Sequence, residues 1–352
     1  MTLMRRRRVG NTDLRLTELG FGTGAAGNLY RPVSDAVARD ALETALTAGV
    51  GYFDTAPFYG FGLSERRIGD ALRGRDDVLI SSKVGRLLVS DRTVKGEALR
   101  EGFASPMPFR AEFDYSYDGI LRSHEASLHR LGLARIDLLL VHDIGRMAHG
   151  AAHPYYWEQL TRGGGFRALD QLRAGGAVGG VGLGVNETEV CLAAFEETKL
   201  DVVLLAGRYT LLEQVALDAF LPACLAHHVS VVIGGPYNSG ILATGTRSDG
   251  PFYYNYDVAP PEIVARVAGM EAIADAHGVT LAAAALQFPL AHPAVASVVP
   301  GLANRDQVER TVTDMQAVIA DAFWRELQAG GFIRADAPVP TGRSATLMPS
   351  DT

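Results

Sequence analysis

The amino-acid sequence predicts a (β/α)8 TIM barrel, and three observations support this. Short apolar runs alternate with longer segments of helical spacing, about eight times along the chain. Most of the runs are continuously apolar, as expected for parallel strands covered on both faces. The chain has 352 residues, of which 47% are hydrophobic, enough for a barrel of about 250 residues. An open doubly wound sheet fits less well, because residues 20–24 lack the third glycine of a dinucleotide-binding turn.

Eight segments are predicted as barrel strands, because each is a short apolar run bounded by polar or small residues. In chain order they are residues 19–23, 52–56, 78–84, 137–143, 178–185, 202–207, 229–236 and 296–301.

Helices are predicted between the strands from their caps and apolar stripes. Ser34 can cap a helix in which Val37, Ala41 and Ala45 form one stripe, and Gly49 can end it. Similar stripes recur in residues 166–172, before a pair of glycines, and in residues 308–319.

Other segments lie outside the repeated units. Residues 5–9 and 13–17 flank a Gly-Asn-Thr turn, which predicts an N-terminal hairpin that plugs the barrel floor. Long loops are expected after strands, at 87–116, 145–164 and 237–261, on the face where barrel enzymes build active sites. The tail, 332–352, is expected to be partly disordered or to fold back as a lid. No shift in composition divides the chain, so residues 1–352 are expected to form a single domain.

Composition and charge exclude several classes of function. Lys plus Arg is 33 and Asp plus Glu is 40, a net charge of -7 that disfavours a nucleic-acid partner. The basic run at residues 5–8 is interpreted as a solvated strand edge, because no signal-like apolar region follows it. No stretch reaches the roughly 20 apolar residues that span a bilayer, so no membrane partner is expected. Cys191 and Cys224 are too few for a thiolate metal site and favour the cytoplasm, while the oligomeric state stays open.

Ionisable side chains follow three successive predicted strands. Asp54 and Tyr59 follow the second strand, Lys83 ends the third and His142 ends the fourth, and these strand ends meet at one rim of a barrel. A buried lysine needs a counter-ion, and Asp54 is the natural one. The ammonium is expected to lower the pKa of Tyr59 from about 10, so that Tyr59 acts as general acid/base while His142 binds the substrate oxygen. Taken singly, each residue also fits an ordinary structural role.

This set resembles the catalytic tetrad of the aldo-keto reductase superfamily, and the resemblance extends from Leu14 to about Val318. The family is a TIM barrel that binds a nicotinamide cofactor without a Rossmann domain, so the resemblance implies NAD or NADP. It assigns cofactor contacts to Gly22, Thr23, Asp54, Asn186, Gly235, Tyr237, Ser239, Gly240, Gly301, Arg305 and Gln307. The helix start after Gly301 and the glycine-rich turn at 235–240 would offer N–H groups to phosphate, although tight βα turns alone would also explain them.

The chain departs from the common family pattern at several positions. Val185 stands where many members have serine, Ala206 where a glutamine is usual, and Gly234 where an aromatic residue stacks on nicotinamide. Gly301 replaces a lysine that often contacts the 2′-phosphate of NADP. Arg305 is then the remaining nearby cation, which favours NAD over NADP.

Residues 113–118, 206–214 and 234–240 resemble the branch that contains D-threo-aldose 1-dehydrogenase, also called L-fucose dehydrogenase, and pyridoxal 4-dehydrogenase. The resemblance implies oxidation of an aldose such as L-fucose at C1 to the lactone, with Tyr59 accepting the hydroxyl proton. Oxidation of pyridoxal, or general aldehyde and ketone reduction, is the alternative. Trp157, in the segment after His142, is expected to stack on the substrate, and it fits a loop-anchoring role equally well.

Two alternatives belong to other classes. A class I aldolase would use Lys83 as a Schiff-base nucleophile, although Asp54 would keep that amine protonated. A cofactor-binding subunit that turns over poorly is the other, and the complete tetrad argues against it.

Overall fold

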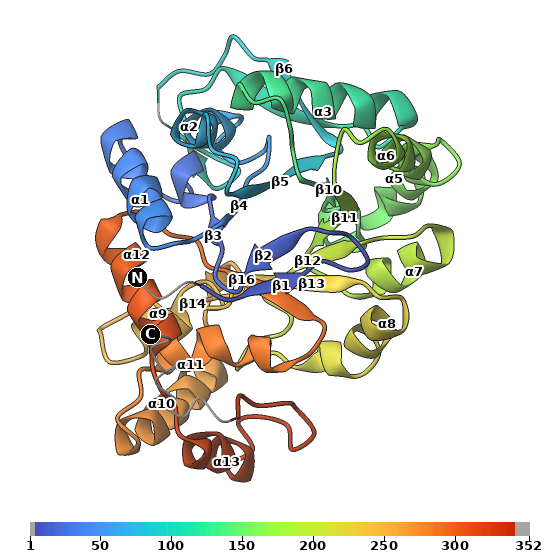
Figure 1. Cartoon of the computed structure of the whole chain (residues 1–352). Helices are drawn as coiled ribbons and strands as arrows, with labels where there is room; N and C mark the ends of the chain where they lie inside the picture. The colour runs from blue at the N-terminus through green and yellow to red at the C-terminus, as the bar shows by residue number, and fades with distance from the viewer. Residues whose placement is uncertain (1–3, 97, 342–352) are drawn as a thin grey trace, which may run out of the picture.

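The computed structural model describes residues 4–96 and 98–341, which form the predicted barrel (Figure 1). Its eight strands are parallel to their neighbours. The strand order is β16 (Val295–Val299), β13 (Ser230–Gly234), β12 (Val202–Ala206), β11 (Gly180–Val185), β10 (Leu138–His142), β5 (Leu79–Val84), β4 (Tyr52–Asp54) and β3 (Phe21–Gly22). Parallel bridges from Leu19 to Val298 and from Gly22 to Gly301 close the ring.

Helices surround the barrel and form the crossovers that parallel strands require (Figure 1). They are α1 (Asp35–Thr47), α2 (Leu63–Leu72), α3 (Tyr117–Leu131), α6 (Gly165–Ala174), α7 (Glu189–Glu197), α8 (Phe220–Ala226), α10 (Pro261–Ala276), α11 (Leu281–Gln287), α12 (Arg305–Gln316) and α13 (Asp321–Ala329). The predicted cap of α1 is confirmed, because the Ser34 side chain accepts a hydrogen bond from the Val37 amide. The predicted stripe was wrong at Val37, which is exposed, since the buried face of α1 runs through Ala38, Ala41, Leu42 and Ala45.

Side chains on the barrel strands alternate between the barrel interior and the surrounding helices. On β10, Leu138 and Leu140 belong to the interior cluster, whereas Leu139 and Val141 pack in the outer core. Both faces of the strand are therefore covered, which explains why its sequence is a continuous apolar run. The same alternation places His142 two residues beyond Leu140 on the interior face.

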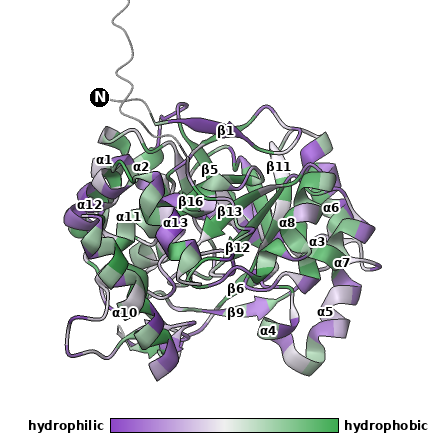
Figure 2. Cartoon of the chain, turned by 90° about the horizontal axis from the view of Figure 1, so that it is seen from below, coloured by the Kyte–Doolittle hydropathy of each residue, from purple (hydrophilic) through white to green (hydrophobic). Residues whose placement is uncertain are grey.

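The N-terminal hairpin is confirmed as the floor of the barrel. β1 (Arg6–Arg8) and β2 (Arg15–Thr17) pair antiparallel. Val9 and Leu16, both fully buried, join the interior cluster with residues of the barrel strands. Figure 2 shows β1 at one end of the molecule, and β6, β9 and α4 at the opposite end.

The three long connections contain regular structure, so the expectation of loops was too simple. The first holds the hairpin of β6 (Arg86–Ser90) with β9 (Phe109–Phe113), and the short strands β7 (Leu99–Arg100) and β8 (Phe103–Ala104). The second is largely helical, with α4 (Arg146–His149), η2 (Gly150–Ala152) and α5 (His153–Leu160). The third holds α9 (Ile241–Thr244) and the hairpin of β14 (Tyr253–Tyr254) with β15 (Asp257–Val258).

The described part of the tail packs on the molecule. Ile333 and Ala337 are buried, and the Arg334 amide donates to the Gln214 side chain. Residues 342–352, the rest of the predicted tail, lie outside the described residues. Within residues 4–96 and 98–341, no helix has both the length and the apolar character needed to cross a bilayer.

Candidate active site

The structure brings together the four side chains singled out from the sequence. Lys83 Nζ lies 2.7 Å from Asp54 Oδ2 and 3.1 Å from the Tyr59 hydroxyl oxygen. The His142 ring meets the Tyr59 ring edge-on, with centroids 5.8 Å apart. Lys83 is only 1% exposed, so its charge is held by the Asp54 carboxylate inside the barrel. The positions of these four residues at the ends of three successive strands therefore predicted a cluster that the structure contains.

Neighbouring groups hold the ion pair in place. Ser81, two residues before Lys83 on the same strand face, donates to Asp54 Oδ1 at 2.7 Å. Lys83 Nζ also donates to the Thr55 carbonyl oxygen at 3.0 Å. A Cβ at Gly184 would lie 3.1 Å from Lys83 Cε, so a glycine at this position of β11 leaves room for the lysine stem. The ammonium therefore has a closely packed, fully bonded environment.

Tyr59 is positioned by a close approach of two backbone segments. A Cβ at Gly60, where φ is +66°, would lie 2.3 Å from the Gly27 carbonyl oxygen. A Cβ at Gly27, at the end of η1 (Ala25–Gly27), would lie 2.6 Å from the Tyr59 carbonyl carbon. Only glycine fits at both positions, and the contact sets where the phenol side chain begins.

The expectation of a lowered pKa for Tyr59 was wrong in its net direction. Burial of the phenol raises its pKa above the usual value, and this outweighs the lowering effect of the Lys83 ammonium, while Asp54 also raises it. The predicted influence of Lys83 thus has the right sign but is not the largest effect. Tyr59 is consequently protonated at neutral pH in this structure.

Lys83 is charged in this structure, whereas His142 is neutral. Burial by itself lowers the pKa of Lys83, but Asp54 and Tyr59 raise it, and the net shift is upward, so the amine is an ammonium. Burial, together with the charges of Arg86 and Lys83, holds the pKa of His142 well below its usual range. His142 is therefore a neutral imidazole.

Several of the expected cofactor residues line the same rim. Asn186 follows β11, and Ser239 and Gly240 follow β13. Asn186 Oδ1 accepts from the Tyr256 hydroxyl at 3.1 Å, and Ser239 Oγ accepts from the Tyr256 amide at 2.9 Å. A Cβ at Gly240 or Gly301 would meet nothing within 4 Å, and Gly235 is exposed. Open space above these glycines lets a ligand approach the backbone, so this rim fits a dinucleotide.

Other expected cofactor residues have structural partners. The hydroxyl of fully buried Thr23 donates to the Asp54 carbonyl oxygen, and Gln307 Oε1 accepts from the Ala303 amide. The Tyr237 hydroxyl lies beside Thr311 of α12. Gly22 pairs with Gly301 where the barrel closes. The described contacts of these residues are within the protein and hold this rim of the barrel together.

Trp157 lies in helix α5, where its ring packs edge-on against Phe166 at 6.1 Å and near His153 at 5.9 Å. It is partly buried against the outer core. These contacts match the loop-anchoring role, and among the described contacts none joins its ring to the tetrad.

Further polar residues beside the tetrad were not singled out from the sequence. Arg86 Nη2 donates to Asp143 Oδ2, and His142 Nε2 lies 3.4 Å from the same oxygen. Tyr256 reaches Asn186 from the β14–β15 hairpin. The local signal for Arg86 and Asp143 was their place within three residues of Lys83 and His142, whereas Tyr256 is far in sequence from the end of any barrel strand.

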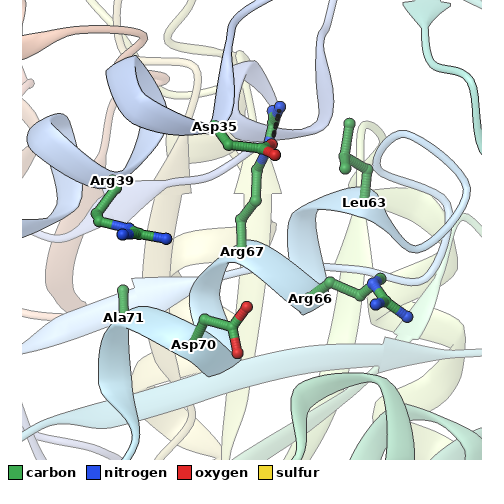
Figure 3. Close-up of a pocket in the computed structure, with 7 residues that line it drawn as sticks. All are labelled: Asp35, Arg39, Leu63, Arg66, Arg67, Asp70 and Ala71. Carbon is green, nitrogen blue, oxygen red and sulfur yellow. Dashed lines mark hydrogen bonds and ion pairs between the residues drawn. The ribbon is translucent and has the colours of Figure 1, made fainter.

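A separate pocket lies between α1 and α2, lined by Asp35, Arg39, Leu63, Arg66, Arg67, Asp70 and Ala71 (Figure 3). Arg67 donates to Asp35 and to the carbonyl oxygens of Ala26 and Val33. This arginine ties the segment after β3 to α2. It thereby supports the backbone contact between Gly27 and Gly60 rather than forming a second site.

The sequence profile of the Aldo/keto reductase family matches residues 18–330, which is most of the chain. The chain belongs to the aldo/keto reductase family. This aldo/keto reductase is 46% identical to pyridoxal 4-dehydrogenase of Microbacterium luteolum, over 93% of this chain and 98% of that protein. It is 39% identical to D-threo-aldose 1-dehydrogenase of a Pseudomonas species, over 89% of this chain and 94% of that protein. These similarities confirm the branch indicated by the sequence motifs.

Solved structures agree with this assignment. An aldo-keto reductase from Bacillus halodurans in its holo form superposes with a TM-score of 0.72 at 25% identity, covering 96% of this chain and 98% of that chain. The protein is therefore a TIM-barrel oxidoreductase of a family that uses NAD or NADP. The Schiff-base aldolase alternative loses its support, because Lys83 is held as an ammonium by Asp54. The family's dehydrogenase members likewise argue against a cofactor-binding subunit without turnover.

Proposed function

We propose that this aldo/keto reductase oxidises an aldose, held as its cyclic hemiacetal, at C1 to the lactone. In this reaction the anomeric carbon loses a hydride and its hydroxyl group loses a proton. A nicotinamide cofactor, when bound at the rim, would supply the hydride acceptor. The observation that carries the proposal is the buried Lys83 ammonium, which donates both to Asp54 and to the Tyr59 hydroxyl oxygen.

Tyr59 is proposed to accept the hydroxyl proton. Its phenolate is needed for that step, and Lys83 is the group that stabilises the phenolate. Because burial keeps Tyr59 protonated at neutral pH, oxidation should accelerate as the pH rises. The reverse reduction should be favoured at lower pH, where the phenol can donate.

His142 is proposed to hold the same substrate oxygen. A neutral imidazole carries one N–H, and the Asp143 carboxylate 3.4 Å from Nε2 favours the proton on that nitrogen. This N–H would then donate to the substrate oxygen. Together Tyr59 and His142 would fix the reacting oxygen between two elements of the rim.

The cofactor is proposed to lie along the rim formed by Asn186, Ser239, Gly240 and Gly301, with NAD preferred to NADP. Arg305 donates to Asp40 on α1 and lies 3.7 Å from Glu309. Its charge is thus already paired with two carboxylates, and a 2′-phosphate would be placed close to them. A ribose hydroxyl group suits such a site better, because a carboxylate can accept its hydrogen bond.

Pyridoxal is the second candidate substrate, and the 46% identity to pyridoxal 4-dehydrogenase favours it. Pyridoxal carries an aldehyde beside a hydroxymethyl group and forms a cyclic hemiacetal as aldoses do. The same loss of a hydride and a proton would convert it to a lactone.

For either substrate we propose the cytoplasm as the location, because Cys191 and Cys224 are buried free thiols.

A substrate screen tests the proposal. L-fucose, D-arabinose, L-galactose and pyridoxal would each be supplied with NAD and, separately, with NADP, and the absorbance of reduced cofactor followed over time. Lactone formation from a sugar with NAD is the expected result. Reaction with pyridoxal alone would favour the second candidate, and no reaction with any hemiacetal would reject the proposal.

A further inference from the structure

A buried ion pair, Arg86 with Asp143, lies beside His142, and no substrate contact has been assigned to it above. Asp143 directly follows β10 and has φ of +46°, an uncommon conformation for a residue other than glycine. Arg86, the first residue of β6, donates to its Oδ2 atom. Asn186 Nδ2 lies 3.3 Å from the other carboxylate oxygen. Three segments that follow different barrel strands therefore meet at one carboxylate.

Arg86 is deeply buried against aromatic rings. It is 8% exposed, with its guanidinium carbon 4.0 Å from the centre of the Phe58 ring and 4.9 Å from that of Phe113. Its Nε atom is buried without a hydrogen-bond partner in the protein. Burying a charge is costly, and an unmade hydrogen bond adds to that cost. Such groups beside a reactive histidine point to a ligand.

The carboxylate of Asp143 lies beside the tetrad, with its Oδ2 atom close to His142 Nε2. Its negative charge contributes to raising the pKa of three phenols on separate segments, those of Tyr59, Tyr115 and Tyr256. Arg86 and Asn186 donate to it and take two of its roughly four lone-pair positions. The remaining positions are open to a hydrogen-bond donor from the substrate.

We propose that Asp143, held by Arg86, accepts a hydrogen bond from the substrate hydroxyl group nearest the reacting carbon. The inference rests on the proposed function, in which Tyr59 and His142 hold the reacting oxygen. Asp143 Oδ2 lies 3.4 Å from His142 Nε2, so a substrate whose reacting oxygen meets His142 can place a second hydroxyl group beside Asp143. An aldose has this hydroxyl group at C2, and pyridoxal has one on the ring carbon next to the aldehyde-bearing carbon. Asp143 would thus select substrates of both kinds.

The test compares each sugar that is a substrate with its 2-deoxy counterpart, at saturating NAD. The wild-type protein should lose about tenfold to a hundredfold in kcat/KM with the 2-deoxy sugar, the range for a hydrogen bond to a charged acceptor. In Asp143→Asn the ratio of kcat/KM for the parent sugar to that for the 2-deoxy sugar should fall towards one, because the neutral amide is a weaker acceptor than the carboxylate. Asp13→Asn, at a fully exposed carboxylate, is the matched control and should keep the wild-type ratio.

The ratio of the two kcat/KM values separates recognition of the hydroxyl group by Asp143 from a purely structural role of this residue. If Asp143→Asn slows both sugars in parallel and keeps the ratio, or if the wild type does not discriminate between them, the proposal is overturned. Even if the variant fails to fold, a wild type that does not discriminate between the two sugars overturns the proposal. If pyridoxal is the only substrate, an analogue without the ring hydroxyl group replaces the 2-deoxy sugar. Failure of the proposed function is distinguishable, because the wild type would then turn over none of the parent hemiacetals.

Discussion

At the scale of single residues, two opposing effects act on the Tyr59 phenol. Burial raises its pKa, and the Lys83 ammonium 3.1 Å away lowers it. Lys83 keeps its charge only because Asp54 lies beside it inside the barrel. The acid/base behaviour of the site therefore depends on three side chains, of which one is proposed to exchange a proton with the substrate.

Replacing Tyr59 by phenylalanine deletes the proposed proton acceptor and little else. We expect kcat to fall by about a hundredfold to ten-thousandfold, the usual contribution of a general acid/base. Cofactor affinity, followed by fluorescence titration with NADH, should stay close to that of the wild type. A near-normal kcat would rule out the proposed role of Tyr59.

Lys83→Met should move the pH profile of oxidation. The substitution removes the effect that lowers the Tyr59 pKa and leaves the burial that raises it, so the pKa should rise further. The rise of kcat with pH should then begin at higher pH, and the reaction should be slower throughout. Lys199→Met, at an exposed lysine, is the control. An active Lys83→Met variant with an unchanged profile would contradict this account.

At the scale of elements, the turn after β4 and the segment after β3 position Tyr59 through backbone contact. Gly60 and Gly27 approach so closely that neither tolerates a Cβ without a shift of the chain. Arg67 on α2 holds the second segment by donating to two of its carbonyl oxygens. The phenol is thus placed by elements that carry none of the tetrad charges.

Gly60→Ala should lower both stability and activity. The residue has φ of +66°, which costs about 1–3 kcal/mol for other residues, and its Cβ would also collide with the Gly27 carbonyl oxygen. Gly74→Ala isolates the first effect, because Gly74 has φ of +76° but open space around it. The Tm of thermal unfolding should fall in both variants, whereas kcat should fall only in Gly60→Ala. If the two variants had equal kcat values, the role of Gly60 in positioning Tyr59 would be refuted.

Sequence patterns predicted the elements better than they predicted the connections. Apolar runs and the Ser34 cap are local signals, so the strands and α1 were found close to their observed positions. The stripe on α1 was misplaced at Val37, because which face is buried depends on the neighbouring helices. The segment 145–164 reads as polar and glycine-rich, yet it forms helices that pack through Trp157 and Phe166.

At the scale of the whole molecule, the barrel separates its stabilising end from its reactive end. The hairpin β1–β2 inserts Val9 and Leu16 into the floor, and the tetrad lies at the other ends of the same strands. Figure 2 shows the two ends, with β1 opposite β6, β9 and α4. We propose that the full chain, 1–352, folds as one barrel domain of this kind.

Leu16→Ala should destabilise the molecule while leaving the chemistry nearly intact. Leu16 is fully buried among interior side chains, so its truncation should cost about 2–5 kcal/mol of unfolding free energy. Urea unfolding measures that loss, and kcat under folding conditions should change little. Leu99→Ala is the control, since Leu99 is 61% exposed and should matter by less than about 0.5 kcal/mol. Equal unfolding free energies for the two variants would show that the hairpin does not seal the floor.

The sequence by itself indicated the barrel, its eight strands and the four side chains that gather at one rim, because periodicity and the residue types at strand ends are local properties. Only the tertiary structure decided that Tyr59 keeps a raised pKa, that Trp157 packs on α6, and that Asp143 meets Arg86 beside His142. Burial and contacts between distant segments arise only when the strands close into a ring, so they have no signature in any one stretch of the chain.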